Sequence, residues 1–150
     1  MRLTRYTDYS LRVLIHLGLH PERLYSVAEI ARVYTISQHH LTKVVNALAR
    51  DGYVTTVRGR NGGMRLGAPP ETIAIGEVIR RTEDGLALAE CGPCALHPAC
   101  DLAGVLAEGV EAMLAVFDRY TLADLLRAKA PMLKLLAIRG RTQRRAPVAV

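Results

Sequence analysis

Three cysteines close together in the second half of the chain are the side chains best suited to chemistry. Cys91, Cys94 and Cys100 stand in a segment that also contains glycine, proline and His97. A loop of that composition can fold so that thiolates separated by two and five residues converge on one site. Because three cysteines make a poor disulfide framework, the segment predicts metal or redox chemistry.

The spacing alone leaves three interpretations of this segment open. An iron–sulfur cluster, either 2Fe–2S or 4Fe–4S, needs the three thiolates and a fourth ligand from elsewhere, such as another subunit. His97 would instead complete a zinc site of three cysteines and one histidine, with two residues between successive ligands. In the third interpretation the thiols are buried or redox-sensing and hold no metal.

Charged residues are divided unevenly along the 150 residues. Residues 1–65 carry ten Lys and Arg against four Asp and Glu, a balance of +6, whereas residues 66–126 carry three against ten, a balance of −7. The last 24 residues carry seven basic and no acidic side chains, which brings the net charge to +6. A basic first half followed by an acidic middle predicts that the first half faces a polyanion, nucleic acid above all.

The basic half has the element order of a winged helix-turn-helix. Apolar residues recur at helical spacing over 4–18, 26–33 and 37–49. Ser26 and Glu29 form a capping box, and Ser37 is expected to cap the third helix. Two short β-type stretches follow, joined by a glycine-rich turn. The fold class predicted is mainly α with a small β-hairpin, with a winged helix-turn-helix DNA-binding domain over 1–68.

DNA contacts are expected from the third helix and from the hairpin. In a helix-turn-helix the second helix of the motif lies in the major groove, with its N-terminal residues at the base edges. Arginines around a glycine-rich tip can reach phosphates or the minor groove without obstruction by other side chains. The predicted contacts are Gln38, His39, His40 and Lys43 on the helix, and Arg58, Arg60 and Asn61 on the hairpin.

The rest of the chain predicts a region for cofactor binding and dimerisation. We expect a connecting helix in 69–84, the cysteine loop in 85–100, a long helix and a short one in 101–130, and a flexible basic tail over 131–150. A small winged-helix domain has little apolar surface to cover the stripe on the long helix, so self-pairing in a twofold homodimer is expected. The stripe consists of Leu102, Val105, Leu106, Val110, Met113, Val116, Phe117 and Tyr120.

Composition and motifs argue against several other classes of protein. Half of the residues are apolar and 23% are charged, which suits a packed aliphatic core rather than disorder. No apolar run approaches the roughly 20 residues that span a bilayer, and the N-terminus does not read as a signal peptide, so a soluble cytoplasmic protein is expected. Neither a phosphate-binding glycine loop nor a nucleophile–base signature supports an enzyme.

Four segments, in this order, resemble the Rrf-type iron–sulfur winged-helix transcription regulators. They are the opening 1–9, the hairpin 57–66, the cysteine loop 94–100 and the segment 120–125, and the resemblance extends from residue 1 to about 136. Within that family the chain is similar to the nitric-oxide-sensing repressors. The resemblance implies a homodimer that binds a pseudo-palindromic DNA operator while it holds its cluster and releases the DNA in response to nitric oxide.

The same resemblance implies a set of ligands. Each cluster would be held by Cys91, Cys94 and Cys100, with Asp8 of the partner subunit as the fourth ligand and His97 as the alternative. Cys91 and Cys94 are closer together here than the matching pair in other members. Two further functions stay open: a regulator of iron–sulfur biogenesis or redox state that senses cluster supply, and a zinc-stapled DNA-binding module.

Overall fold

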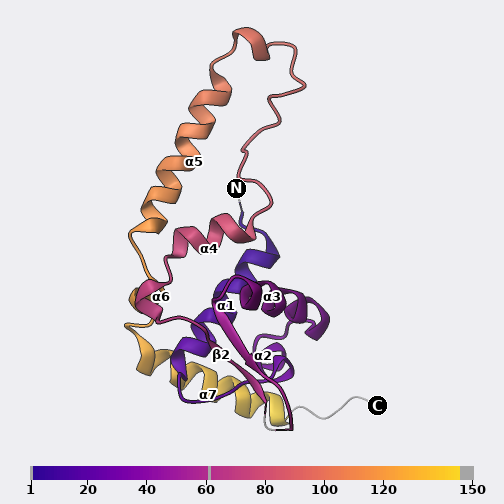
Figure 1. The fold of residues 1–150 in the computed structure, drawn as a ribbon, viewed down its shortest axis with the longest axis vertical. Helices are drawn as coiled ribbons and strands as arrows, with labels where there is room; N and C mark the ends of the chain where they lie inside the picture. The colour runs from indigo at the N-terminus through magenta and orange to yellow at the C-terminus, as the bar shows by residue number, and fades with distance from the viewer. Residues whose placement is uncertain (1, 61, 146–150) are drawn as a thin grey trace.

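The computed structural model describes residues 2–60 and 62–145, and its first five elements build a winged helix-turn-helix (Figure 1). The strands form an antiparallel pair in which Val54 lies opposite Leu66. The predicted fold class is confirmed. The elements are α1 (Arg5–Leu19), α2 (Val27–Tyr34), α3 (Gln38–Arg50), β1 (Val54–Val57) and β2 (Gly63–Leu66).

Capping interactions of side chains mark the start of α1 and α2, whereas the cap predicted for the third helix at Ser37 does not form. Thr4 accepts a hydrogen bond from an amide in the first turn of α1, and Ser26 and Glu29 form the predicted capping box at the start of α2. Ser37 occupies the N-cap position of α3, but its side chain makes no capping hydrogen bond. Thr35 ends α2 in the left-handed conformation, with φ of 56°, and so produces the turn into α3.

The core of this body is aliphatic, as the composition predicts. An isolated bridge between Tyr25 and Met64 joins the segment before α2 to β2, so the hairpin is held by the helical body as well as by its own pairing. Fully buried side chains come from all three helices and from the hairpin: Val13, Leu14, Leu17, Ile30, Leu41, Val44, Leu48 and Met64.

A buried histidine lies against this core without a hydrogen-bond partner. His16 is 3% exposed, and neither of its ring nitrogens has a partner among the described residues. The rings of Tyr25 and Tyr34 meet it edge-on, with centroids 4.6 and 5.6 Å away. Burial, followed by the nearby His20 and Arg23, lowers the pKa of His16 from 6.5 to about 4, because a buried imidazolium loses its hydration.

The fold is therefore expected to lose stability as the pH falls below neutral. The unfolded chain takes up this proton near pH 6.5 and the folded chain only near pH 4, so the unfolded state binds more protons in between. Denaturant titrations should show the free energy of unfolding decreasing by about 2 kcal/mol from pH 7 to pH 5. In His16→Phe, whose ring can make the same edge-on contacts, this decrease should largely disappear.

Other groups with lowered pKa values also contribute to the pH dependence of stability, and their contributions can be distinguished from that of His16. The lowered pKa values of Glu29 and Asp124, held down by hydrogen bonds from Ser26 and Thr121, affect stability below the usual carboxylate range and so outside this pH interval. Burial also lowers the pKa of His20. A His20→Gln variant therefore measures how much of the decrease in the free energy of unfolding comes from His20. An unchanged pH dependence in His16→Phe would contradict the assignment.

Helix α4 (Ile75–Thr82) joins the winged-helix body to the long helix α5 (Leu102–Asp118). It occupies only part of the segment 69–84 in which a connecting helix is predicted, because a separate 3-10 turn, η1 (Pro70–Thr72), precedes it. Arg80 donates two hydrogen bonds to the carboxylate of Asp118, at 2.6 and 2.8 Å. Gly76 approaches the same carboxylate so closely that a Cβ there would clash with it. The C-terminal end of α5 is thus fixed to the body, with α6 (Leu122–Leu125) directly after it.

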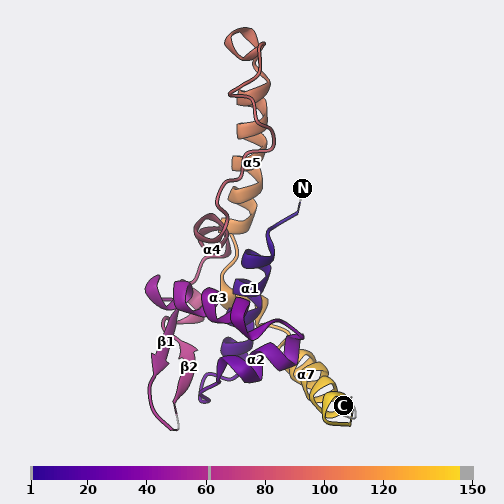
Figure 2. The same cartoon turned by 90° about the vertical axis from the view of Figure 1, so that its right-hand side faces the viewer.

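Away from this joint, α5 extends from the body as an arm (Figures 1 and 2). Val110 and Leu114 are its buried residues. Leu102 and Val105, by contrast, are 51% and 62% exposed. The single chain therefore leaves much of the predicted apolar stripe uncovered, and its burial by a second subunit stays a prediction.

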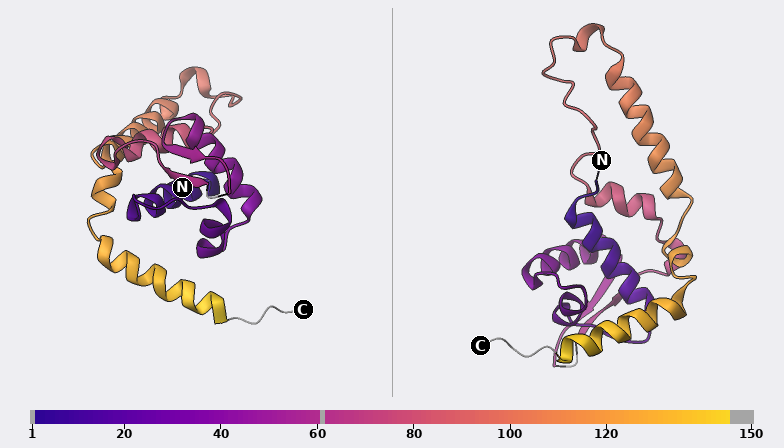
Figure 3. Two further views of the ribbon diagram at one scale, coloured as in Figure 1. Left: turned by 60° about the horizontal axis from the view of Figure 1, so that its bottom comes forward. Right: turned by 180° about the vertical axis from the view of Figure 1, so that it is seen from behind.

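Residues 131–145 of the predicted flexible tail 131–150 are helical in this structure, and 146–150 lie outside the described residues. Helix α7 (Lys129–Arg145) crosses beneath the winged-helix body (Figure 3). Met132 and Leu136, one turn apart, line a groove together with Ile15 and Leu19 of α1. Pro131 falls in the first helical turn, where its missing amide hydrogen breaks no intrahelical bond. The segment thus carries an apolar edge in addition to its arginines. Neither α7 nor any other helix in the described part of the chain is long and apolar enough to cross a membrane.

Candidate metal centre and nucleic-acid interface

The cysteine loop connects α4 to α5 at the far end of the arm (Figure 1). Cys94 and Cys100 are exposed and Cys91 is partly buried, and all three are free thiols. A single 3-10 turn, η2 (His97–Ala99), separates the last two cysteines. The loop therefore presents its thiols at a position remote from the winged-helix body.

Backbone hydrogen bonds arrange the candidate ligands at a period of three residues. The amide of Cys94 donates to the carbonyl of Cys91 at 3.1 Å, that of His97 to the carbonyl of Cys94 at 3.0 Å, and that of Cys100 to the carbonyl of His97 at 3.5 Å. Side chains three residues apart eclipse one another in regular 3-10 turns. In the described part of the chain, however, no three His, Cys, Asp or Glu side chains gather closely enough to hold a metal. The backbone thus spaces the candidate ligands regularly, but their side chains do not converge on one point in this structure.

The chemistry of these side chains fits a soft metal centre. Thiolates are the ligands that iron–sulfur clusters require and that structural zinc sites prefer. His97 is exposed at the start of η2, where it is available as a nitrogen ligand within the same loop. The loop residues present are therefore compatible with a cluster that takes one ligand from elsewhere, and also with a zinc site.

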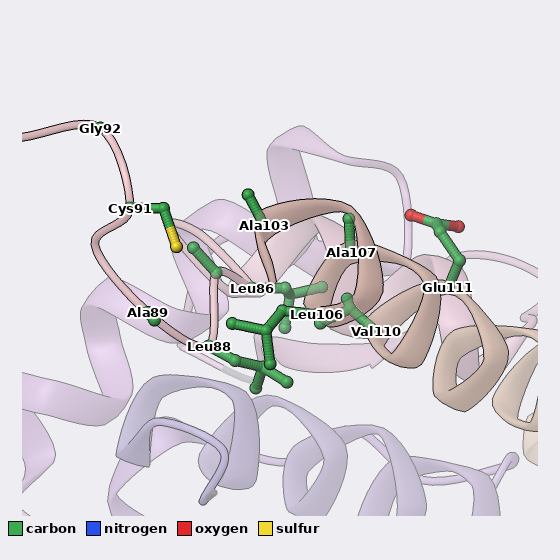
Figure 4. Close-up of a pocket in the computed structure, with 11 residues that line it drawn as sticks. Leu86, Leu88, Ala89, Cys91, Gly92, Ala103, Leu106, Ala107, Val110 and Glu111 are labelled. Atoms are coloured by element: carbon green, nitrogen blue, oxygen red, sulfur yellow. The ribbon is translucent and has the colours of Figure 1, made fainter. Parts of the chain in front are cut away.

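A pocket of about 410 Å³ lies between the first half of the loop and α5 (Figure 4). Leu86 and Leu88 line it from the loop, and Leu106 and Val110 line it from α5. Figure 4 shows the thiol of Cys91 turned toward this pocket. The apolar lining limits the access of water to one side of that thiol, and such shielding tunes the chemistry of a metal centre.

Asp8 lies in the first turns of α1, in the winged-helix body rather than in the arm. Its carboxylate accepts a hydrogen bond from Arg12 at 2.8 Å. It lines an open cavity of about 320 Å³ formed by the start of α1 and the residues before it. The structure therefore does not bring Asp8 together with the cysteines of its own chain.

The start of α1 is tied to the root of the cysteine loop. Glu83, directly after α4, accepts hydrogen bonds from the amide of Thr4 at 2.8 Å and from its hydroxyl at 3.1 Å. Because Thr4 is also the N-cap of α1, a movement of the loop at its root reaches the helix that carries Asp8. No local pattern in the sequence marks Glu83, because its partner is 79 residues away.

The four residues of α3 that were predicted to read DNA all lie on its exposed face. The hydroxyl of Thr42, on the same face, donates to the carbonyl of Gln38 at 2.8 Å. Helices α1 and α2 both contact α3. The exposed residues are Gln38, His39, His40 and Lys43. Those buried against the body are Leu41, Val44, Val45 and Leu48.

The hairpin tip presents Arg58 and Arg60 as exposed side chains, as predicted. Asn61, the third predicted contact there, lies outside the described residues. Gly59 has a φ of 109°, a conformation that favours glycine, and its carbonyl accepts a hydrogen bond from the amide of Gly62 at 2.9 Å. These glycines allow a tight tip, which leaves the two arginines on the outside.

Known proteins match this chain over most of its length. Residues 3–128 match the Rrf2 family, described as an iron-dependent transcriptional regulator. The HTH-type transcriptional regulator NsrR of Bacillus subtilis (strain 168) is 50% identical over 145 residues, which cover 93% of this chain and 99% of that protein. The regulator of the same name from Shouchella clausii is 51% identical over 131 residues, which cover 83% and 88%.

Solved structures of similar proteins share the fold. CymR, the global cysteine regulator of B. subtilis, superposes with a TM-score of 0.65 at 28% identity, covering 83% of this chain and 95% of that one. IscR of T. potens gives a TM-score of 0.70 at 26% identity, covering 85% and 88%. The curated relatives are transcription regulators, so the prediction of a regulator rather than an enzyme is confirmed. This chain belongs to the Rrf2 family of transcriptional regulators.

Proposed function

We propose that this chain is an iron–sulfur-dependent transcriptional repressor of the cytoplasm that senses nitric oxide. Its cluster-bearing homodimer occupies a pseudo-palindromic operator and leaves it when nitric oxide is present. The cysteine loop carries the proposal, because it holds three free thiols in successive three-residue turns at the end of an uncovered apolar helix. The family's description as iron-dependent, and the identity to regulators named NsrR, support it.

The operator is read by α3 and by the hairpin. Gln38 has the amide geometry that bonds adenine in two places, and Lys43 reaches guanine or a phosphate. Arg58 and Arg60 contact phosphates beside the groove, where the glycine-rich tip permits a close approach. These roles need the outer face of α3 to be free, and its residues there are exposed.

The dimer forms through α5. Pairing of the two stripes around a twofold axis buries Leu102 and Val105, which one chain leaves more than half exposed. A twofold dimer presents its two recognition helices to half-sites about 34 Å apart, one turn of DNA. The same twofold axis would therefore relate the two α5 helices and the two half-sites of the palindromic operator.

Cys91, Cys94 and Cys100 would hold the cluster, of the 2Fe–2S or the 4Fe–4S type, with Asp8 of the partner subunit as the fourth ligand. When bound, the cluster supplies iron that reacts with nitric oxide. A carboxylate oxygen is a weaker ligand than a thiolate for soft metal centres, so the carboxylate of Asp8 is the ligand released most easily. Once released, it pairs with Arg12 of its own helix, as it does in this structure.

The release of Asp8 affects the DNA-binding surface through α1. The helix that carries Asp8 packs against α3, and its N-cap residue Thr4 is held by Glu83 at the root of the loop. Loosening these contacts changes the separation of the two recognition helices in the dimer. A coupling of about 1–3 kcal/mol between the two sites changes DNA affinity roughly 5- to 150-fold.

The composition of the protein purified without oxygen tests this proposal. We expect brown protein with iron and acid-labile sulfide in similar amounts, and titration with nitric oxide should abolish both the visible spectrum and the binding of operator DNA. Intact DNA binding after complete loss of the spectrum would contradict the sensing mechanism. Colourless protein with about one zinc per chain would leave the DNA-binding half of the proposal standing and make the loop a structural staple.

Asp8→Ala tests the fourth ligand. The side chain is half exposed, so the fold should persist. DNA binding should stay measurable but weaken, as it does when the ligand is released, and the half-life of the cluster spectrum in air should shorten about tenfold, an effect typical of altered metal surroundings. Glu22→Ala, which also removes an exposed acidic side chain from the same body, is the matched control. A spectrum and a nitric oxide response identical to those of the unmodified protein would remove Asp8 from the mechanism.

A further inference from the structure

An open groove separates the first turns of α1 from the flank of α3. Its volume is about 210 Å³ and its lining is mostly apolar, with aromatic rings on one wall and an aliphatic side chain on the other. Its basic members are exposed, so the groove combines an apolar floor with a cationic rim. The lining residues are Arg5, Tyr6 and Tyr9 of α1 and His40, Lys43 and Val44 of α3.

The charge of this groove is not neutralised from within the described part of the chain. No acidic residue lines it, and neither Arg5 nor Lys43 forms an ion pair there. Asp8, on the same helix, is paired with Arg12 and lines a different cavity. Two unpaired cations on one groove favour an anionic ligand, and the apolar floor favours one that also carries an uncharged, ring-shaped part.

We propose that this groove binds the sugar–phosphate backbone of the DNA strand beside the recognition helix. The guanidinium of Arg5 contacts a phosphate, and the ring of Tyr9 packs against a deoxyribose. The inference rests on the proposed function, in which α3 reads DNA, and adds the start of α1 as a third contact region. Continuity supports it, because His40 and Lys43 belong both to the recognition surface and to the groove.

The position of Arg5 connects this contact to the proposed sensor. Arg5 lines the groove beside α3 and also the cavity that contains Asp8. Thr4, the preceding residue, is held by Glu83 at the root of the cysteine loop. Any displacement of this turn therefore shifts Arg5 relative to Lys43 and alters the groove that receives the backbone.

The salt dependence of DNA binding tests the groove. Fluorescence anisotropy would follow the full-length protein, purified without oxygen, on a mixed-sequence duplex long enough for two half-sites. Each phosphate contact contributes about 0.9 to the slope of log K against log salt concentration, so Arg5→Gln should reduce the slope by about 1 per subunit. Arg127→Gln removes the same charge from an exposed side chain after α6, and it should retain the original slope.

The outcomes separate this inference from the proposed function. An unchanged slope in Arg5→Gln, together with a reduced slope in Lys43→Gln, would overturn the contact at α1 and leave DNA binding by α3 in place. If the unmodified protein shows no salt-dependent binding to the duplex, the proposed function itself fails. Tyr9→Leu supplies a second test: it should weaken binding several-fold at every salt concentration without changing the slope, because the ring carries no charge. Thermal melting followed by circular dichroism confirms that each variant is folded.

Discussion

Replacing Cys94 with serine is expected to yield a folded protein that carries no iron–sulfur cluster. Cys94 is the middle thiol of the loop, and its own hydrogen bonds to Cys91 and His97 are made by the backbone, which serine preserves. The substitution thus removes a soft ligand and little else, and two thiolates do not hold a cluster that requires three. Iron and acid-labile sulfide per chain should fall to background, and the visible absorbance should disappear.

His97→Gln is the informative companion to this variant. If the fourth ligand comes from Asp8 of the partner subunit, His97→Gln should keep its iron, sulfide and spectrum. Loss of bound zinc in both Cys94→Ser and His97→Gln would instead identify a site of three cysteines and one histidine. Full iron content and an unaltered spectrum in Cys94→Ser would show that this cysteine is not a ligand.

The effect of Cys94→Ser on DNA binding follows from the same assignment. Without a cluster, the variant should bind operator DNA as weakly as the unmodified protein does after treatment with nitric oxide. Further nitric oxide should then have no effect on it. Gel-shift or anisotropy measurements before and after treatment provide this comparison, and tight binding by the untreated variant would separate the cysteine loop from control of DNA affinity.

Val105→Glu is expected to convert the proposed dimer to monomers. The valine is 62% exposed in the single chain and lies on the apolar stripe of α5. Around a twofold axis the substitution places two carboxylates in one apolar interface, where burying an unpaired charge costs several kcal/mol. A cost of about 3 kcal/mol raises the dissociation constant of the dimer at least 100-fold, which sedimentation velocity at low micromolar concentration would detect.

Glu108→Gln provides the matched control for this variant. Glu108 is an exposed residue of the same helix, off the apolar stripe, so its substitution should leave the dimer intact. Monomers of Val105→Glu should also lose most of their affinity for a two-site duplex while keeping weak binding to a single half-site. A stable dimer of Val105→Glu would mean that the chain associates through another surface.

The amino-acid sequence determined those elements whose cause lies within a few residues. Ser26 and Glu29 form the expected capping box because the two side chains need only one turn of helix to meet. The hairpin tip follows from its glycines, and the outer face of α3 follows from the spacing of its apolar residues. The cysteine loop was recognisable for the same reason, since its three cysteines are close together along the chain.

The tertiary structure alone decided the features that depend on partners far apart in the sequence. Helical spacing could not show that α7 would find an apolar groove on α1, nor that Glu83 would hold Thr4. Arg5 became a candidate for DNA contact only when α1 was placed beside α3. Asp8 was found in a cavity at the start of α1, where it does not join the cysteines of its own chain. The physical reason is that a cap or a turn is a local equilibrium, whereas the partner of a distant residue is chosen by how all the elements pack together.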